Sequence, residues 1–187
     1  MYETSDIRNG LKIELDNQPW TVTYFQFVKP GKGTAFTRTK LKSLLSGNTV
    51  ERTFRTGEKL QPADVEERSM QYLYNDGEDY HFMNTETFEQ VAISEKVLGK
   101  STRFLLDEMI TSVLFYKGNP VNIDLPNFVE LEVTYTEPAV KGNTAQGATK
   151  TAELSTGATV NVPLFIETGE VLKIDTRDGS YVERVRK

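Results

Sequence analysis

Hydrophobic residues alternate with polar ones along most of the chain, which is the period-two pattern of strands that bury one face. Short runs rich in Val, Ile, Thr, Tyr and Phe, as at 20–28 and 128–136, end at Gly, Asn, Asp or Pro. Asp-Gly pairs at 76–77 and 178–179 supply the positive φ angles that tight hairpins require. The pattern predicts an all-β protein.

The segment 84–108 is the main departure from this alternation. Its apolar residues, which include Val97 and Leu98, are interspersed with charges in a way that fits one or two short helices. Ser94 precedes two charged residues and is typical of a helix N-cap. Further along, residues 138–150 are rich in Gly, Ala, Thr and Pro and predict a long loop.

Charge and proline positions divide the chain into three segments. Residues 1–63 hold ten Lys and Arg against six Asp and Glu, residues 64–127 hold five against twelve, and residues 128–187 hold seven against nine. Pro62 and Pro126 lie near the two boundaries. Each segment is so small that closing its sheet into a barrel is the simplest way to protect the strand edges. We therefore expect three small β-barrels in series.

Composition and motifs argue against an enzyme. The 187 residues include no Cys and a single His, His81, which removes thiolate nucleophiles and the common zinc sites and leaves little for acid–base catalysis. The phosphate-binding P-loop pattern fails at two positions, where Gln26 replaces Gly and Gly33 replaces Ser or Thr. We expect a non-enzymatic protein with neither a cofactor nor a metal.

The chain carries no pattern typical of export or membrane insertion. No run approaches the roughly 18 apolar residues of a membrane span, and the polar N-terminus lacks the basic start and apolar stretch of a signal peptide. We expect a cytoplasmic protein that does not contact membranes. The distribution of charge matters more than the net charge of −5, because the basic first segment can face phosphates and the acidic middle segment cannot broadly do so.

The sequence KPGKG at 29–33 lies between two predicted strands of the basic segment. Its proline and two glycines favour a tight, exposed bend that lifts Lys32 off the barrel. A lysine held in this way can reach a phosphate, enter a narrow channel or meet a modifying enzyme. The pentapeptide alone fits a solvated hairpin lysine equally, and that is the commoner case.

Several segments, taken in order, resemble the elongation factor P family of bacterial translation factors. The matching stretches are KPGKG with the following AF and TRTKLK, then YLYNDGEDYHFMNTETFEQ, PNFVELEV and the ending DTRDGSYVERV. The residues that match the family's signature in the last segment are Lys150, Ala152, Gly157, Val160, Val162, Pro163, Ile166 and Gly169. The resemblance covers essentially the whole chain, which makes it more specific than any single motif.

The resemblance implies a fold and a function. The fold is an SH3-like, KOW-type barrel at 1–63, followed by oligonucleotide/oligosaccharide-binding (OB) barrels at 64–127 and 128–187, set in an L that imitates transfer RNA. The family's members act without catalysis as translation elongation factors, and their eukaryotic and archaeal relatives carry hypusine. We therefore expect a monomeric factor that enters the ribosome between the peptidyl and exit sites and relieves stalling at consecutive prolines.

The resemblance also assigns roles within the basic segment. Lys32 matches the family's modified lysine, which a modifying enzyme lengthens and which extends towards the CCA end of peptidyl-tRNA. The residues that would shape and support this tip are Lys29, Pro30, Gly31 and Gly33. Charge, rather than a family motif, makes three further residues candidate contacts to the RNA backbone: Arg38, Lys40 and Lys42.

In the last segment the family carries a Gly-Asp-Thr loop that approaches the exit-site codon of the messenger RNA. The matching residues here are Gly142, Asn143 and Thr144, so an amide that donates and accepts hydrogen bonds replaces a charged carboxylate. Tyr181 and Arg184 match an aromatic and basic pair near the family's C-terminus and are expected to contact the ribosome. Strand packing of Tyr181 and a solvated charge at Arg184 are the alternatives.

Two other functions stay open on the sequence alone. One is that of an elongation-factor-P-like paralogue with a narrower role, and the survival of Lys32 and its loop argues against it. The other is that of a general single-stranded RNA-binding or chaperone protein built from the same barrels. Such a protein would bind free oligonucleotides in a salt-dependent manner, and the acidic middle segment argues against this.

Overall fold

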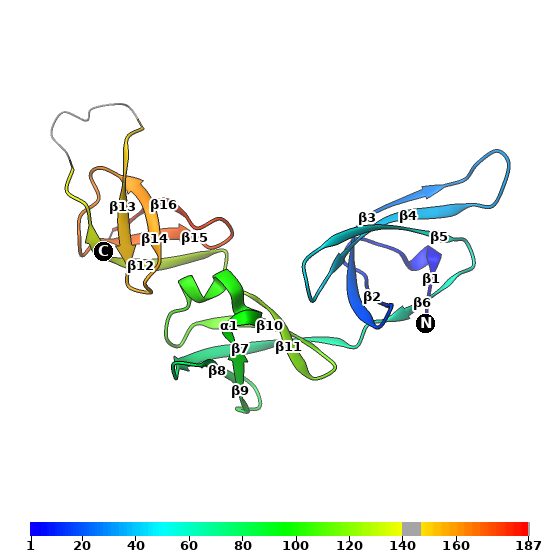
Figure 1. Ribbon diagram of the computed structural model, residues 1–187, viewed down its shortest axis with the longest axis horizontal. Coiled ribbons are helices and arrows are strands. Elements are labelled where there is room, and N and C mark those ends of the chain that lie inside the picture. The colour runs from blue at the N-terminus through cyan, green and yellow to red at the C-terminus, as the bar shows by residue number, and fades with distance from the viewer. Residues whose placement is uncertain (140–146, 187) are drawn as a thin grey trace. The chain divides into compact units, whose positions relative to one another are not determined.

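The computed structural model describes residues 1–139 and 147–186, and these residues form three β-sheets joined by short turns (Figure 1). The prediction of an all-β protein is confirmed. Contacts divide the chain into two compact units, residues 1–68 with 113–122 and residues 69–112 with 123–187. The expected domain boundaries and L shape stay predictions.

The first sheet has the strand order β1-β6-β2-β3-β4-β5. Its strands are β1 (Tyr2–Glu3), β2 (Lys12–Leu15), β3 (Gln18–Val28), β4 (Phe36–Ser43), β5 (Thr49–Arg55) and β6 (Lys59–Pro62), with a 3-10 turn η1 at Thr4–Asp6. Asp16 and Asn17 both have positive φ, 52° and 60°, and form the two-residue turn between β2 and β3. The core consists of Ile7, Ile13, Val22, Leu41, Phe54 and Leu60.

The second sheet has the order β11-β10-β7-β8-β9. Its strands are β7 (Val65–Asn75), β8 (Asp79–Asn84), β9 (Gln90–Ser94), β10 (Ile110–Tyr116) and β11 (Asn119–Asp124). The helical prediction for 84–108 is wrong at β9, which pairs with β8 and buries Ile93. Helix α1 (Glu95–Leu98) and the 3-10 helix η2 (Gly99–Phe104) follow, and Ser94 is the N-cap residue without a capping hydrogen bond from its side chain.

The third sheet has the order β14-β13-β12-β15-β16. Its strands are β12 (Phe128–Thr136), β13 (Thr149–Leu154), β14 (Thr159–Pro163), β15 (Val171–Asp175) and β16 (Ser180–Val185). Phe104 of η2 belongs to the core of this sheet, together with Leu131, Val133 and Ile174. Strand β13 was not predicted, and it begins inside the segment 138–150 that the composition assigned to a loop.

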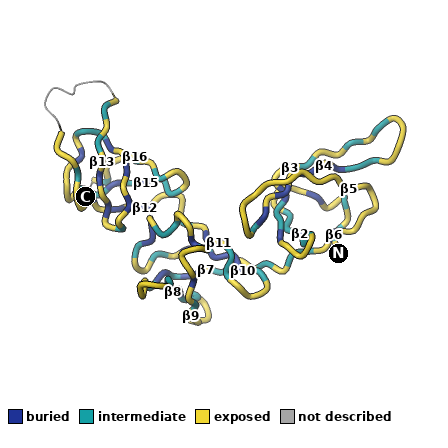
Figure 2. Tube along the Cα trace, in the orientation of Figure 1, coloured by how far each residue is buried: buried dark blue, intermediate teal, exposed yellow. Residues whose placement is uncertain are grey.

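Burial follows the expected alternation, and it locates the surfaces open to ligands (Figure 2). In β4 the side chains of Thr37, Thr39 and Leu41 are buried, whereas Arg38 and Lys40 between them are exposed. The loop between β3 and β4 is exposed over most of its length (Figure 2). Among the described residues, no helix has the length and apolar character needed to cross a membrane.

Candidate functional site

The loop that carries Lys32 closes the long hairpin of β3 and β4. Val28 and Phe36 form the last backbone pair of this hairpin, so the loop comprises residues 29–35. Figure 1 shows the hairpin projecting away from the rest of its sheet. Gly33 has φ +105°, a conformation that residues with a Cβ rarely adopt, and this explains a glycine directly after Lys32.

Lys32 itself is exposed, as are Lys29, Gly31 and Gly33, whereas Pro30 is half-buried. Within residues 1–139 and 147–186, the side chain of Lys32 has no hydrogen-bond or ion-pair partner. Its ammonium group is therefore open to an anionic ligand or to a modifying enzyme. The five residues lie together as the sequence predicts, and their functional roles stay predictions.

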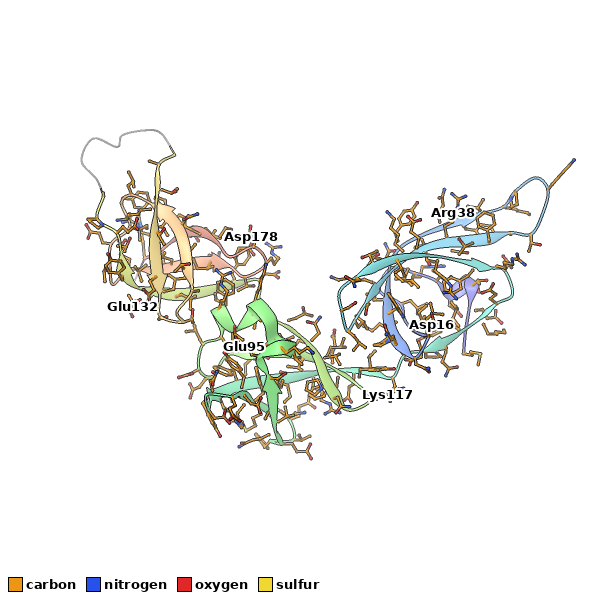
Figure 3. The ribbon with its side chains drawn as sticks, viewed as in Figure 1. Asp16, Arg38, Glu95, Lys117, Glu132 and Asp178 are labelled. Atoms are coloured by element: carbon orange, nitrogen blue, oxygen red, sulfur yellow. The ribbon has the colours of Figure 1, made fainter. Side chains whose placement is uncertain are left out.

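The outward side of β3, β4 and β5 is rich in cationic and aromatic side chains, and we call it the basic face. Strand register places Arg38 between Gln26 and Thr53, and Lys40 between Tyr24 and Glu51. The residues of the basic face are Tyr24, Gln26, Phe36, Arg38, Lys40, Lys42, Thr53 and Arg55. Arg38 is labelled in Figure 3.

Cations on this face lie against aromatic rings. The guanidinium of Arg38 lies 5.5 Å from the centre of the Phe36 ring, and the ammonium of Lys40 lies 5.6 Å from that of Tyr24. On the opposite side of the strand, the hydroxyl of Thr39 donates to the backbone carbonyl of Arg52 at 2.7 Å. A polar residue is thus buried at low cost, because its hydroxyl is hydrogen-bonded.

Two shallow hollows run along the basic face. One, of about 380 Å³, is lined by Tyr24, Gln26, Arg38, Thr39, Lys40, Glu51, Arg52 and Thr53. The other, of about 550 Å³, is lined by Thr34, Phe36, Arg38, Thr53 and Arg55. Arg38 lines both hollows, and the sequence alone did not point to Arg55. Its register with β4 was the missing information, since Phe36 lies opposite Arg55.

The chemistry of the basic face suits a polyanion with flat bases. Arg and Lys pair with phosphates, and exposed aromatic rings offer stacking surfaces. Glu51 lies beside Lys40 and reduces the positive charge at one end. Among the described residues, no three or more His, Cys, Asp or Glu side chains are gathered as a metal site.

Tyr181 and Arg184, the predicted contacts of the last segment, both lie on β16. Tyr181 is half-buried and packs against the core of the third sheet, as the packing alternative proposed. Arg184 donates to Oε1 of Glu170 at 3.0 Å, and its guanidinium lies 4.8 Å from the ring centre of Phe165. Arg184 is exposed, as the solvated-charge alternative expects, and it is also paired with Glu170. Gly142, Asn143 and Thr144 lie outside the described residues.

A backbone N–H group and Arg184 together lower the pKa of the Glu170 carboxyl. The pKa of Glu170 is lowered first by a hydrogen bond from the backbone N–H of Glu167 and then by Arg184. The carboxylate therefore stays charged and keeps Arg184 in place. Any RNA contact by Arg184 uses the part of its guanidinium that Glu170 and Phe165 leave exposed.

The side chain of His81, the one histidine, contacts residues of its own hairpin. Its Nε2–H donates to Oδ2 of Asp76 at 2.7 Å, and its ring stacks on Tyr74 with centres 4.5 Å apart. Asp76 also accepts hydrogen bonds from the N–H groups of Glu78 and Asp79. These bonds, the one from His81 foremost, hold the pKa of Asp76 far below its ordinary value. The pair closes the β7–β8 hairpin.

Three family descriptions match the chain in succession. Residues 3–60 match the elongation factor P KOW-like domain, residues 65–123 the elongation factor P OB domain, and residues 129–184 the elongation factor P C-terminal domain. The expected order of a KOW-type barrel and OB folds is confirmed.

Full-length relatives carry the same description. Elongation factor P of Moorella thermoacetica is 56% identical over 184 residues, which cover 98% of this chain and 100% of the relative. Elongation factor P of Syntrophomonas wolfei is 53% identical over 185 residues, covering 99% of this chain and 100% of the relative. Both alignments extend over the whole of each relative.

Solved structures of translation factors share the fold at low sequence identity. Translation initiation factor 5A of Methanococcus jannaschii has a TM-score of 0.51 at 20% identity, covering 66% of this chain and 93% of its own. A member of the same factor family from Naegleria fowleri has a TM-score of 0.53 at 16% identity, covering 66% and 96%. At these identities the likeness concerns the fold.

Proposed function

The chain belongs to the elongation factor P family, and from this premise we propose that it binds the ribosome between the peptidyl and exit sites and positions peptidyl-tRNA. Family membership makes the chain a ribosome-associated translation elongation factor. The proposed client reaction is peptide bond formation at consecutive prolines. The observation that carries the proposal is Lys32, exposed at the tip of a hairpin that continues into the basic face.

The restricted backbone of proline explains why positioning the substrates is enough to promote peptide bond formation. Its ring locks φ, so a prolyl substrate reaches the reactive geometry less readily than other residues do. Holding two reactants in a productive arrangement can be worth about 7–11 kcal/mol in favourable cases. A factor that steadies the end of peptidyl-tRNA therefore needs no general acid or base of its own.

Lys32 is the group proposed to reach the CCA end of the tRNA. Its side chain has no partner among the described residues, so it can extend fully from the loop. Addition of a chemical group by a modifying enzyme would lengthen the arm and add hydrogen-bond donors. Pro30 and Gly33 would keep the loop in the shape that presents it, because each restricts or permits a specific backbone conformation.

The remaining contacts follow from charge and position. Arg38, Lys40 and Lys42 are proposed to contact phosphates of the tRNA backbone, and Arg55 joins them as their neighbour on β5. Further ribosome contacts are proposed for the last segment, at Gly142, Asn143, Thr144, Tyr181 and Arg184. We place this activity in the cytoplasm, in a monomer that uses no cofactor.

Translation of a polyproline reporter with the purified full-length chain tests the proposal. Lys32→Ala should abolish rescue of the reporter while leaving the melting temperature unchanged, because the side chain of Lys32 is exposed and forms no hydrogen bond or ion pair within the described residues. Lys96→Ala, a change of another exposed lysine, serves as the matched control and should rescue normally. Full rescue by Lys32→Ala would contradict the proposal. Intact-mass measurement of the native protein shows which group Lys32 carries.

A further inference from the structure

Phe88, in the turn between β8 and β9, combines two unfavourable features. Its side chain is 68% exposed, although it is one of the largest apolar residues in the chain. Its φ is +63°, a left-handed conformation that residues with a Cβ adopt only at an energetic cost. Glycine would remove both costs, so the folding of the chain gives no reason for a phenylalanine here.

The turn that presents Phe88 is held by hydrogen bonds. Oδ1 of Asn84 accepts from the N–H groups of Glu86 at 2.8 Å and Thr87 at 3.1 Å. The N–H of Phe88 donates to the carbonyl of Asn84 at 2.9 Å, and the N–H of Asn84 donates to the carbonyl of Glu89 at 2.8 Å. The ring is therefore displayed from an ordered backbone, and a partner would bind it with little further loss of entropy.

The charges beside Phe88 indicate the kind of partner. Glu86 and Glu89 lie on either side of Phe88 in the sequence. Both are exposed, and neither forms an ion pair within the part of the chain that the structure describes. Phosphates would be repelled by these two carboxylates, whereas a surface rich in Lys and Arg would be attracted. A protein partner is thus favoured over RNA, in contrast to the basic face.

We infer that the turn 84–89 is a protein-docking site, in which Phe88 enters an apolar pocket whose rim carries Lys or Arg side chains. Rigid aromatic anchors ringed by polar residues often supply most of the free energy of an interface. The inference rests on the proposed function in one respect, since the partner is a protein of the ribosome.

Binding of the full-length chain to purified ribosomes that carry peptidyl-tRNA tests this site. Phe88→Ala and Phe88→Gly should each raise the Kd by at least about fivefold. Ile110→Ala, which trims an apolar side chain that is 49% exposed, is the matched control and should leave the Kd unchanged. Phe88→Gly should keep or raise the melting temperature, because glycine adopts the same φ without strain. Weaker binding therefore cannot be assigned to misfolding.

Photo-crosslinking identifies the chemical class of the partner. With p-benzoylphenylalanine in place of Phe88, the crosslinked product on the same ribosomes should resist ribonuclease and map to a protein segment containing Lys or Arg. A crosslinked product that ribonuclease trims back towards the mass of the chain alone, or an unchanged Kd for Phe88→Ala when the wild-type chain binds, would overturn the inference alone. Failure of the wild-type chain to bind ribosomes would overturn the proposed function and this inference together.

Discussion

The hydroxyl of Tyr116 donates a hydrogen bond to Oε1 of Glu14, joining residues 102 positions apart. Glu14 lies on β2 and Tyr116 at the end of β10, and both belong to the first compact unit. The ammonium of Lys117, labelled in Figure 3, lies 3.8 Å from the same oxygen. Oε2 of Glu14 is buried and has no hydrogen-bond partner among the described residues. Tyr116 and Lys117 therefore offset the energetic cost of burying the Glu14 carboxylate.

Tyr116→Phe should destabilise the chain, because it removes a hydrogen-bond donor from the Glu14 carboxylate, whose other oxygen already has no hydrogen-bond partner among the described residues. We expect the melting temperature to fall by roughly 2–4 °C. Tyr74→Phe is the matched control, since Tyr74 is exposed and its ring stacking on His81 does not use the hydroxyl. Equal melting temperatures for wild type and Tyr116→Phe would show that the hydrogen bond makes no net contribution.

The same pair should respond to alkaline pH. The hydrogen bond to Glu14, followed by burial, raises the pKa of Tyr116 above its ordinary value of 10.0. A raised pKa in the folded state means that the stabilisation is complete below pH 10 and is lost as the pH rises through the folded pKa. Denaturant unfolding from pH 8 to 11 should show the advantage of wild type over Tyr116→Phe shrinking above pH 10. A constant difference across this range would contradict the assignment.

Asp76 should contribute to stability with the opposite pH dependence. Its pKa is depressed chiefly by the hydrogen bond from His81, so its contribution is present above the ordinary value of 3.8 and is lost as the pH falls below it. Asp76→Asn should therefore be less stable than wild type near pH 6, and the two should converge in strong acid. Glu78→Gln, in the same hairpin, serves as the control because its carboxylate makes no hydrogen bond within the described residues.

Arg38 should contribute an electrostatic share of ribosome binding. If it contacts a phosphate, Arg38→Gln should weaken binding and reduce the slope of log K against log salt concentration by about one. Lys59→Gln is the control, because Lys59 is exposed on β6 and pairs with Glu3 within the first sheet. An unchanged slope for Arg38→Gln would remove the basic face from the proposed interface.

Local patterns predicted the elements well where alternation and turn residues agree. The hairpin turns at Asp76-Gly77 and Asp178-Gly179 lie where their sequences place them, and the glycine of each has positive φ. The prediction failed at β9, where buried Ile93 alternates with exposed neighbours over only five residues. So short a run cannot be distinguished from a helical pattern without the partner strand β8.

The sequence by itself determined which side of β4 faces solvent, that a glycine-rich loop presents Lys32, and which family the chain resembles. These follow from a period of two residues, from the conformations open to glycine and proline, and from residue order along the whole chain. Only the tertiary structure placed Arg55 opposite Phe36, and Tyr116 against Glu14. Strand register and contacts between distant residues depend on how the complete chain packs, and no local pattern encodes them.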